Sequence, residues 1–281
     1  MNIKSSFSHK NQEPESSVLY IVGTPIGNLG DLSSRALNIL KNVSLIACED
    51  TRQTKKLMNK YEFTNNLICF NKHNSYTKTS KIINDLSSGK SVALVSDAGM
   101  PSICDPGEDL VRKAKINGIN IICIPGPCAA LTALVTSGLP SSKFTFEGFL
   151  PKKKSDRENI LVEISNNKNT TILFESPYRL KKLLIELKEY LGGNREIHIS
   201  RELTKKLCRE GASNGVLTGN YKAEGKQARV RGRRNFNVVL SKETQIEGRI
   251  KLRQSNSRFH YPYNANDYAN RRKMLLVILY F

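Results

Sequence analysis

The chain has 281 residues, enough for one large domain or two of ordinary size. Hydrophobic residues make up 39% of it and charged residues 25%, and no apolar run approaches the roughly 20 residues of a membrane helix, which disfavours a membrane protein. The 44 basic and 25 acidic residues give a net charge of +19, which favours a polyanionic partner such as nucleic acid.

The N-terminal segment 1–17 lacks the apolar core of a signal peptide and is predicted to be a disordered tail. Six cysteines occur, none of them in a CxxC pair, and the four histidines stand singly. A structural zinc site needs clustered ligands, so no metal is predicted. Cysteines of this kind fit the reducing environment of the cytoplasm, where we expect the protein to reside.

Five short apolar runs in the first half of the chain are predicted to be buried strands. They are residues 18–22, 43–48, 67–70, 91–96 and 119–124. Helical segments are expected after each run, at 33–40, 51–61, 79–88, 105–117 and 125–137. Because the strands are apolar on both faces and alternate with helices, we predict a mainly parallel sheet covered by helices.

The fourth of these helices carries the clearest start signal. Asp105 suits the N-cap position, Pro106 the first helical position, and Glu108 falls three residues after the cap. The helix is therefore expected to begin at Pro106, with Asp105 as its cap.

After Pro140 the pattern indicates a second α/β unit. Its strands are expected at 144–149, 171–175 and 195–200, and its helices at 157–164 and 180–191. Beyond Leu207 the chain is basic and rich in Gly and Asn. Residues 235–240 are the candidate for one last strand. The apolar run 274–281 either packs on the core or is a divergent end. The predicted domains are an N-terminal α/β domain 18–139, a C-terminal α/β domain 140–240 and a basic tail 241–281.

Three loops that follow predicted strands are rich in Gly and Pro: 23–31, 97–107 and 125–128. Ligands of parallel sheets bind outside the carboxyl ends of the strands, and glycine lets the backbone approach a ligand closely. These loops are either a shared ligand crevice or ordinary tight turns. The chain has no GxGxxG after its first strand and no GxxxxGK[ST], which disfavours a dinucleotide-binding Rossmann unit and a P-loop ATPase.

Seven collinear strings between Val18 and Lys206 resemble one family. They are LYIVGTPIGNLGDLSSRAL (19–37), LIACEDTRQTKKL (45–57), VALVSDAGMPSICDPGEDLV (92–111), IPGPCAALTALVTSGLP (124–140), FTFEGFLPKKK (144–154), FESPYRL (174–180) and RELTKK (201–206). The family is that of the bacterial 16S ribosomal RNA (cytidine-2'-O)-methyltransferases, the I-type small-subunit enzymes of the tetrapyrrole-methylase superfamily. Met100, Cys104 and Cys128 depart from its usual Thr, Ser and Ser, and from Leu207 the chain leaves its pattern.

The resemblance implies S-adenosylmethionine as methyl donor and the ribose 2'-hydroxyl of a cytidine in 16S ribosomal RNA of the small subunit as target. It also implies two α/β domains with the cofactor in the cleft between them, and a homodimer. The cofactor contacts that it implies are Thr24, Pro25, Gly27, Asp97, Ala98, Gly99, Cys128, Ala129 and Phe174.

A nearby carboxylate could take the proton of the ribose hydroxyl. Glu49, Asp50 and Glu175 are the candidates because each follows a strand end, but Asp50 is equally suited to capping a helix and Glu175 to pairing with Arg179.

For contacts with RNA the candidates are basic. They are Arg52, His73, Lys152, Lys153, Arg179 and Arg201, with ordinary ion pairs or a solvated loop as the alternative. Two other functions stay open: a tetrapyrrole methyltransferase of cobalamin synthesis, and a catalytically inactive ribosome-binding relative.

Overall fold

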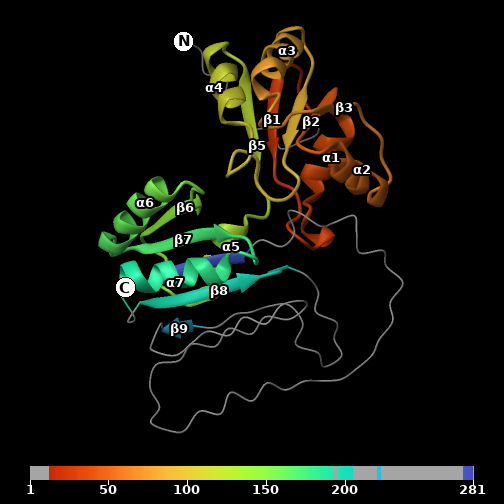
Figure 1. The fold of residues 1–281 in the computed structure, drawn as a ribbon. Helices are drawn as coiled ribbons and strands as arrows, with labels where there is room; N and C mark the ends of the chain where they lie inside the picture. Colours follow the sequence, from red (N-terminus) through yellow and green to blue (C-terminus); the bar gives the residue numbers. More distant parts are fainter. Residues whose placement is uncertain (1–12, 193–194, 205–219, 223–274, 281) are drawn as a thin grey trace. The chain divides into compact units, whose positions relative to one another are not determined.

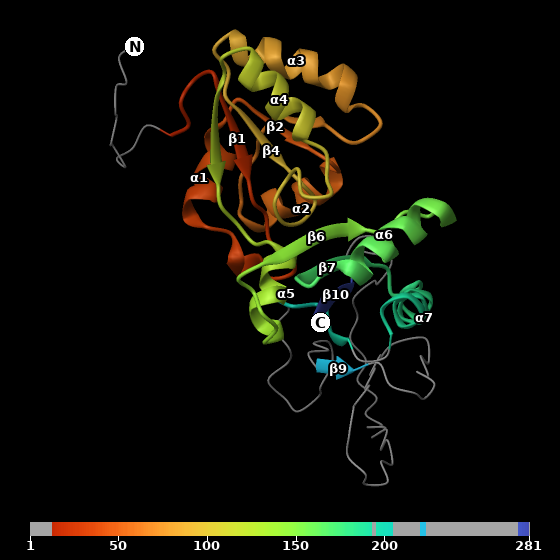
Figure 2. The same cartoon turned by 90° about the vertical axis from the view of Figure 1, so that its left-hand side faces the viewer.

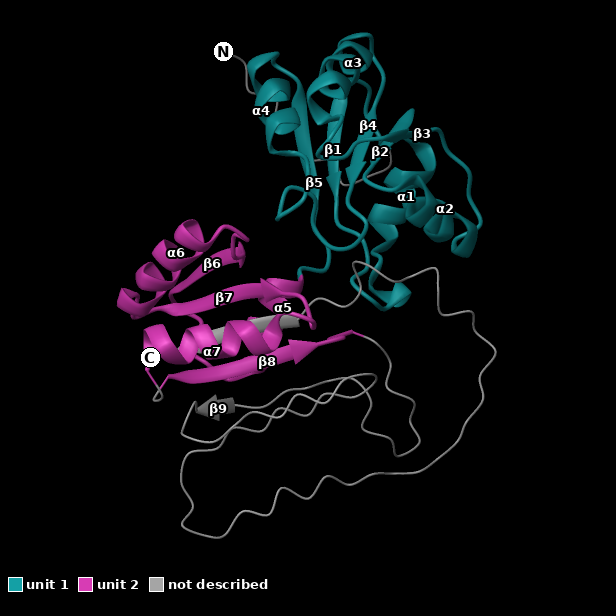
Figure 3. Cartoon of the chain, in the orientation of Figure 1, with its two compact units in different colours: residues 1–128 teal, residues 129–281 magenta. Residues whose placement is uncertain are grey.

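The structure, a computed structural model, describes residues 13–192, 195–204, 220–222 and 275–280. The chain divides into two compact units, Met1–Cys128 and Ala129–Phe281, coloured separately in Figure 3. Each unit is built around a five-stranded sheet of its own. The described part contains no helix long and apolar enough to cross a membrane.

The first unit contains the five predicted strands, all parallel, in the order β3-β2-β4-β1-β5 (Figure 1). Their bounds are β1 (Val18–Val22), β2 (Leu45–Cys48), β3 (Leu67–Cys69), β4 (Val92–Val95) and β5 (Asn120–Ile124). The helices between them are α1 (Ser34–Asn42), α2 (Thr51–Lys60), α3 (Ser75–Ser87) and α4 (Glu108–Ile116), with a short 3-10 turn at Leu29–Asp31. The prediction of a parallel α/β sheet is confirmed.

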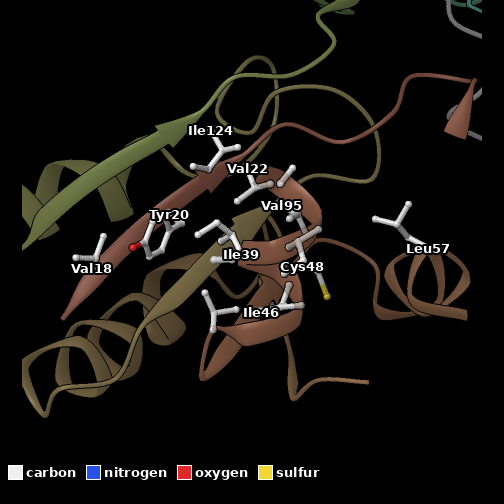
Figure 4. Packing of buried hydrophobic residues seen from close by; sticks show 13 residues of the cluster. Val18, Tyr20, Val22, Ile39, Ile46, Cys48, Leu57, Val95 and Ile124 are labelled. Carbon is white, nitrogen blue, oxygen red and sulfur yellow. The ribbon is translucent and has the colours of Figure 1, made fainter. Parts of the chain in front are cut away.

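Alternate residues of each strand face opposite helical layers. Tyr20 and Cys48 pack with Ile39 of α1 and Leu57 of α2, in the cluster drawn in Figure 4. The intervening residues, such as Leu94, pack with α3 and α4 on the other face. Because both faces are covered, the strands are apolar throughout, and this is why their positions can be read from the sequence.

The strand order explains where a ligand site belongs. The chain leaves β1 toward β2 and β3, but it leaves β4 in the opposite direction, toward β5. Right-handed crossovers then place α1 and α4 on opposite faces of the sheet. The carboxyl ends of β1 and β4 are therefore the topological switch point, where ligands of open α/β sheets bind.

The predicted start of α4 is wrong by two residues. The helix begins at Glu108, with Gly107 as its N-cap at φ +150°, and not at Asp105 and Pro106. A Cβ at Gly107 would lie 2.3 Å from Ser102 Oγ and 2.9 Å from Leu94 Cδ2. The close packing of this turn on β4 delays the helix, which local capping signals could not show.

The second unit has a mixed sheet in the order β6-β7-β10-β8-β9, in which β6 and β7 are parallel and the other pairs antiparallel. Its strands are β6 (Phe144–Phe149), β7 (Thr170–Glu175), β8 (Glu196–Arg201), β9 (Asn220–Lys222) and β10 (Leu275–Tyr280). Its helices are α5 (Ala129–Ser137), α6 (Lys154–Asn166) and α7 (Leu180–Leu191). Helices α6 and α7 bury their apolar faces against Leu173 of β7 and Ile197 and Ile199 of β8 (Figure 2).

Two predicted domain limits need correction. The units divide after Cys128 and not after residue 139, because α5 packs against β10 of the second sheet. The end of the predicted tail 241–281 is not separate from the second domain, because β10 pairs with β7 on one side and β8 on the other. The predicted strand at 235–240 lies outside the described residues, as does most of the predicted N-terminal tail.

Candidate active site

The turns after β1 and β5 meet in the first unit at two glycines. The N–H of Gly23 donates to the carbonyl of Ile124 over 3.1 Å. A Cβ on Gly23 would lie 2.6 Å from the Cα of Gly126, and a Cβ on Gly126 would lie 2.7 Å from the Cα of Gly23. Only glycine at both positions permits this backbone contact.

The turn after β4 pairs with Thr24 of the turn after β1. Thr24 and Gly99 form an antiparallel bridge, with N–H to carbonyl distances of 2.9 and 3.0 Å in the two directions. The buried Thr24 hydroxyl donates to the carbonyl of Ser96 over 3.2 Å. Gly99 has φ +86°, a conformation that L side chains rarely adopt. The turns after β1, β4 and β5 are therefore in contact with one another.

A fourth turn, after β2, is hydrogen-bonded to the turn after β4. The N–H of Asp50 donates to the carboxylate of Asp97 over 3.0 Å. Glu49, directly before it, is 6% exposed at the carboxyl end of β2. Glu49 and Asp97 therefore follow two neighbouring strands, β2 and β4, and Asp97 lies two residues before Gly99 of the Thr24–Gly99 bridge.

Asp50 caps a helix, which is one of the two roles that its position in the sequence allows. Its carboxylate caps α2 by accepting the N–H of Arg52 over 2.9 Å, and it also forms an ion pair with the Arg52 guanidinium. The hydrogen bond from the Arg52 side chain holds the pKa of Asp50 below its ordinary value. A carboxylate with a lowered pKa is a weak base.

Cys48 lies on the strand beside these carboxylates, in the apolar core. Burial raises the pKa of its thiol to about 11, so this cysteine is a core residue and not a nucleophile.

In the second unit Glu175 ends β7 and is 1% exposed. Its carboxylate forms ion pairs with Arg179 at 2.7 Å and with the buried Arg157 of α6 at 3.7 Å. Arg157 reaches on to Glu186 of α7 at 2.6 Å. The expected Glu175–Arg179 pair is therefore present, and Arg157, which the sequence analysis missed, links β7 to both covering helices.

Phe174 lies within an aromatic cluster that the sequence analysis also missed. Its ring meets Phe146 and Phe149 edge to face, with centroid distances of 5.0 and 5.5 Å. The pairing of β6 with β7 shifts register between Phe146 and Gly148. Because this bulge adds one residue, two phenylalanines three positions apart reach the same side of the sheet.

The remaining predicted site residues are spread over several surfaces. Arg52, His73, Lys152 and Lys153 are exposed, and Arg179 and Arg201 are half-buried. Of the residues predicted to contact S-adenosylmethionine, Ala98 is exposed and lies in the converging turns. Pro25, Gly27, Cys128 and Ala129 are half-buried. No group of three or more His, Cys, Asp or Glu side chains suited to a metal occurs among the described residues.

Comparison with known families identifies the class to which this architecture belongs. The model of the Tetrapyrrole (Corrin/Porphyrin) Methylases matches residues 18–209, and the chain belongs to that family. The solved structure of the cobalamin biosynthetic enzyme cobalt precorrin-4 methyltransferase has the same fold, with a TM-score of 0.52 and 15% identity over 67% of this chain and 81% of that one.

Comparison with curated relatives shows which members of the family this chain resembles. Ribosomal RNA small subunit methyltransferase I of Vibrio cholerae is 48% identical over 67% of this chain and 65% of its own length. The protein of the same name from Halalkalibacterium halodurans is 50% identical over 69% and 67%, and that of Thermotoga maritima 48% identical over 66% and 83%. The chain thus matches about two thirds of the length of the first two of these relatives.

Proposed function

We propose that the chain transfers a methyl group from S-adenosylmethionine to the ribose 2'-hydroxyl of a cytidine in 16S ribosomal RNA. The observation that carries this proposal is the 44–50% identity to curated relatives that are named as methyltransferases of small-subunit ribosomal RNA. The net charge of +19 is consistent with an RNA substrate. The tetrapyrrole alternative has weaker support, because the relationship to the corrinoid enzyme extends only to the fold.

The converging turns of the first unit suit the methyl donor. Gly23 and Gly126 let the turns after β1 and β5 come into contact, and Gly99 pairs with Thr24, so the turn that carries Asp97 and Ala98 is held beside them. The backbone of the exposed Ala98 and the carboxylate of Asp97 match the amino-acid end and ribose of S-adenosylmethionine. When bound, the donor supplies an electrophilic methyl group on a sulfonium. Contacts from Ala129 and Phe174 of the second unit remain predictions.

The main task of the protein is to hold the ribose hydroxyl in line with the methyl group, because positioning supplies much of the rate in such transfers. A carboxylate then accepts the hydroxyl proton. Asp50 and Glu175 are held by arginine partners in structural roles. Glu49, buried at the end of β2 next to the Asp50 N–H that is held by Asp97, is the candidate we favour.

Binding of the RNA is assigned to the predicted basic residues, of which Arg52, Lys152 and Lys153 are exposed. Neutralising phosphates releases counterions, so affinity for RNA should fall steeply as salt rises. A homodimer is also part of the proposal, on the ground of the family resemblance alone.

Nucleoside mass spectrometry tests the proposal. Small subunits from cells that lack this activity are incubated with the purified protein and S-adenosylmethionine carrying a labelled methyl group. One labelled 2'-O-methylcytidine per 16S RNA is the expected result. Methylation of a corrinoid precursor without methylation of the subunit would support the tetrapyrrole alternative, and absence of donor binding by calorimetry would support the inactive relative.

A further inference from the structure

Tyr76, in the first turn of α3, has an aromatic side chain that does not pack in the hydrophobic core. It is 82% exposed, and the Nζ of Lys113 on the adjacent helix α4 lies 5.0 Å from the centroid of its ring. A lysine over an aromatic ring forms a cation–π contact. Lys113 therefore covers one face of the ring and restrains it, and the exposure leaves the ring available to a ligand.

Contacts along the chain connect this turn to the candidate active site. Asn74, just before α3, donates from its side chain to the carbonyl of Cys69 over 3.1 Å. The thiol of Cys69 in turn donates to the carbonyl of Glu49 over 3.4 Å. The turn at Asn74 thus lies at the same carboxyl edge of the sheet as Glu49 and Asp50, and Tyr76 follows it by two residues within the same unit.

The surroundings of Tyr76 are basic. Lys72 and His73 are exposed in the turn before α3. The acidic groups of the two helices are already paired, Asp85 with Lys90, and Glu108 and Asp109 with Arg112. Within the described residues, no acidic side chain forms an ion pair with Lys72, Lys78 or Lys113.

We propose that Tyr76, held by Lys113, is a stacking platform for an unpaired base of the small-subunit RNA that flanks the methylated nucleotide. The inference rests on the proposed function and adds a binding site to it. Single-stranded RNA is bound by aromatic side chains that stack on bases within a positively charged surface. Lys72, exposed four residues before Tyr76, supplies that charge, and the pre-positioned tyrosine loses little freedom when a base stacks on it.

The first test compares Tyr76→Phe with Tyr76→Ala on unmethylated small subunits. Loss of one base–aromatic stack weakens binding by about 5- to 100-fold. The Ala variant should therefore raise the KM for subunits by about that factor, with the affinity for S-adenosylmethionine unchanged, and the Phe variant should behave as the wild type. Equal KM values for all three proteins would overturn the inference.

A second test has a readout independent of activity, because the chain contains no tryptophan. Tyr76→Trp places a single indole on the platform, and its fluorescence should be quenched when unmethylated small subunits bind. The matched control is Val162→Trp on α6, 47% exposed and on a helix with Glu158 and Glu163, where no quenching is expected.

These outcomes separate the inference from the proposed function. Wild-type protein that methylates no ribosomal RNA would refute the function itself. Wild-type methylation with no quenching in the Tyr76→Trp variant, or with equal quenching in the Val162→Trp variant, would refute only the platform. A higher KM for subunits in Tyr76→Ala without quenching in Tyr76→Trp would also refute it, because the ring would then contact ribosomal protein and not a base.

Discussion

Glu175 shows how a carboxylate at a strand end can serve the fold and not the reaction. It is buried between Arg157 and Arg179, so Glu175→Ala removes the counter-charge of Arg179 and leaves Arg157 with Glu186 as its partner. We expect a loss of about 1–3 kcal/mol in the free energy of unfolding, measured by urea denaturation. Arg179→Ala, which removes the more exposed partner and leaves the pair with Arg157, is the control and should cost much less. Equal stability of Glu175→Ala and the wild type would contradict this assignment.

Cys48 and Cys123 both lie in apolar strands of the first sheet but differ in reactivity. Burial raises the pKa of Cys48 to about 11, so at pH 8 only roughly one thiol in a thousand is ionised. Cys123 is exposed. Iodoacetamide at pH 8 should therefore label Cys123 and leave Cys48 unmodified in the folded protein, as peptide mass spectrometry would show. Comparable labelling of both would contradict the burial of Cys48.

The Gly23–Gly126 contact is the element that brings the strand-end turns together. In Gly23→Ala the new Cβ meets backbone at 2.6 Å, so the turns after β1 and β5 must separate. We expect calorimetry to show at least a roughly 10-fold loss of affinity for S-adenosylmethionine, with reduced stability. Gly89→Ala is the control, because nothing lies within 4 Å of a Cβ added at Gly89, whose φ is +94°. That variant should cost about 1 kcal/mol of stability and leave donor affinity unchanged.

Helix α2 begins at the Asp50 cap. Asp50→Ala should destabilise the protein by about 1 kcal/mol, and Asp50→Asn, which keeps a capping oxygen, by less. Because the pKa of Asp50 is lowered from its ordinary 3.8, its stabilising effect is present above that pH and is lost as the pH falls through the lowered value. Urea denaturation at about pH 7 and about pH 3 should therefore show a smaller difference between wild type and Asp50→Ala at the lower pH.

The sequence predicts helices and strands well where buried apolar residues recur along a segment. It predicts them poorly where the structure depends on one local packing contact. The strands of the first unit are apolar on both faces, and their predicted positions are correct to within two residues. The first turn of α3 was missed because Ser75, Tyr76 and Thr77 are polar or exposed and carry no apolar period. The Gly148 bulge and the buried Arg157 were missed because each depends on a partner from another element.

The second sheet depends on the last residues of the chain. Strand β10 lies between β7 and β8, and its Val277 is paired with Leu173 on one side and Ile199 on the other. The sequence shows an apolar run here but not its pairing, because the partner strands lie more than 70 residues away. Without β10, β7 and β8 would each expose an unpaired edge.

Val277→Pro should therefore disrupt the second unit, because proline removes a backbone donor from a central strand. We expect insoluble protein or loss of cooperative thermal unfolding. Val277→Thr keeps both the N–H and the β-branched side chain and should remain soluble and folded. A soluble Val277→Pro variant with wild-type melting would contradict the central position of β10.

A crystal structure of the protein with S-adenosylhomocysteine, the demethylated donor, tests the proposed donor site most directly. We expect this molecule to lie against the switch point of the first sheet, in contact with the turns at Thr24, Asp97–Gly99 and Gly126. Binding at any other place, with these turns untouched, would contradict the proposed site.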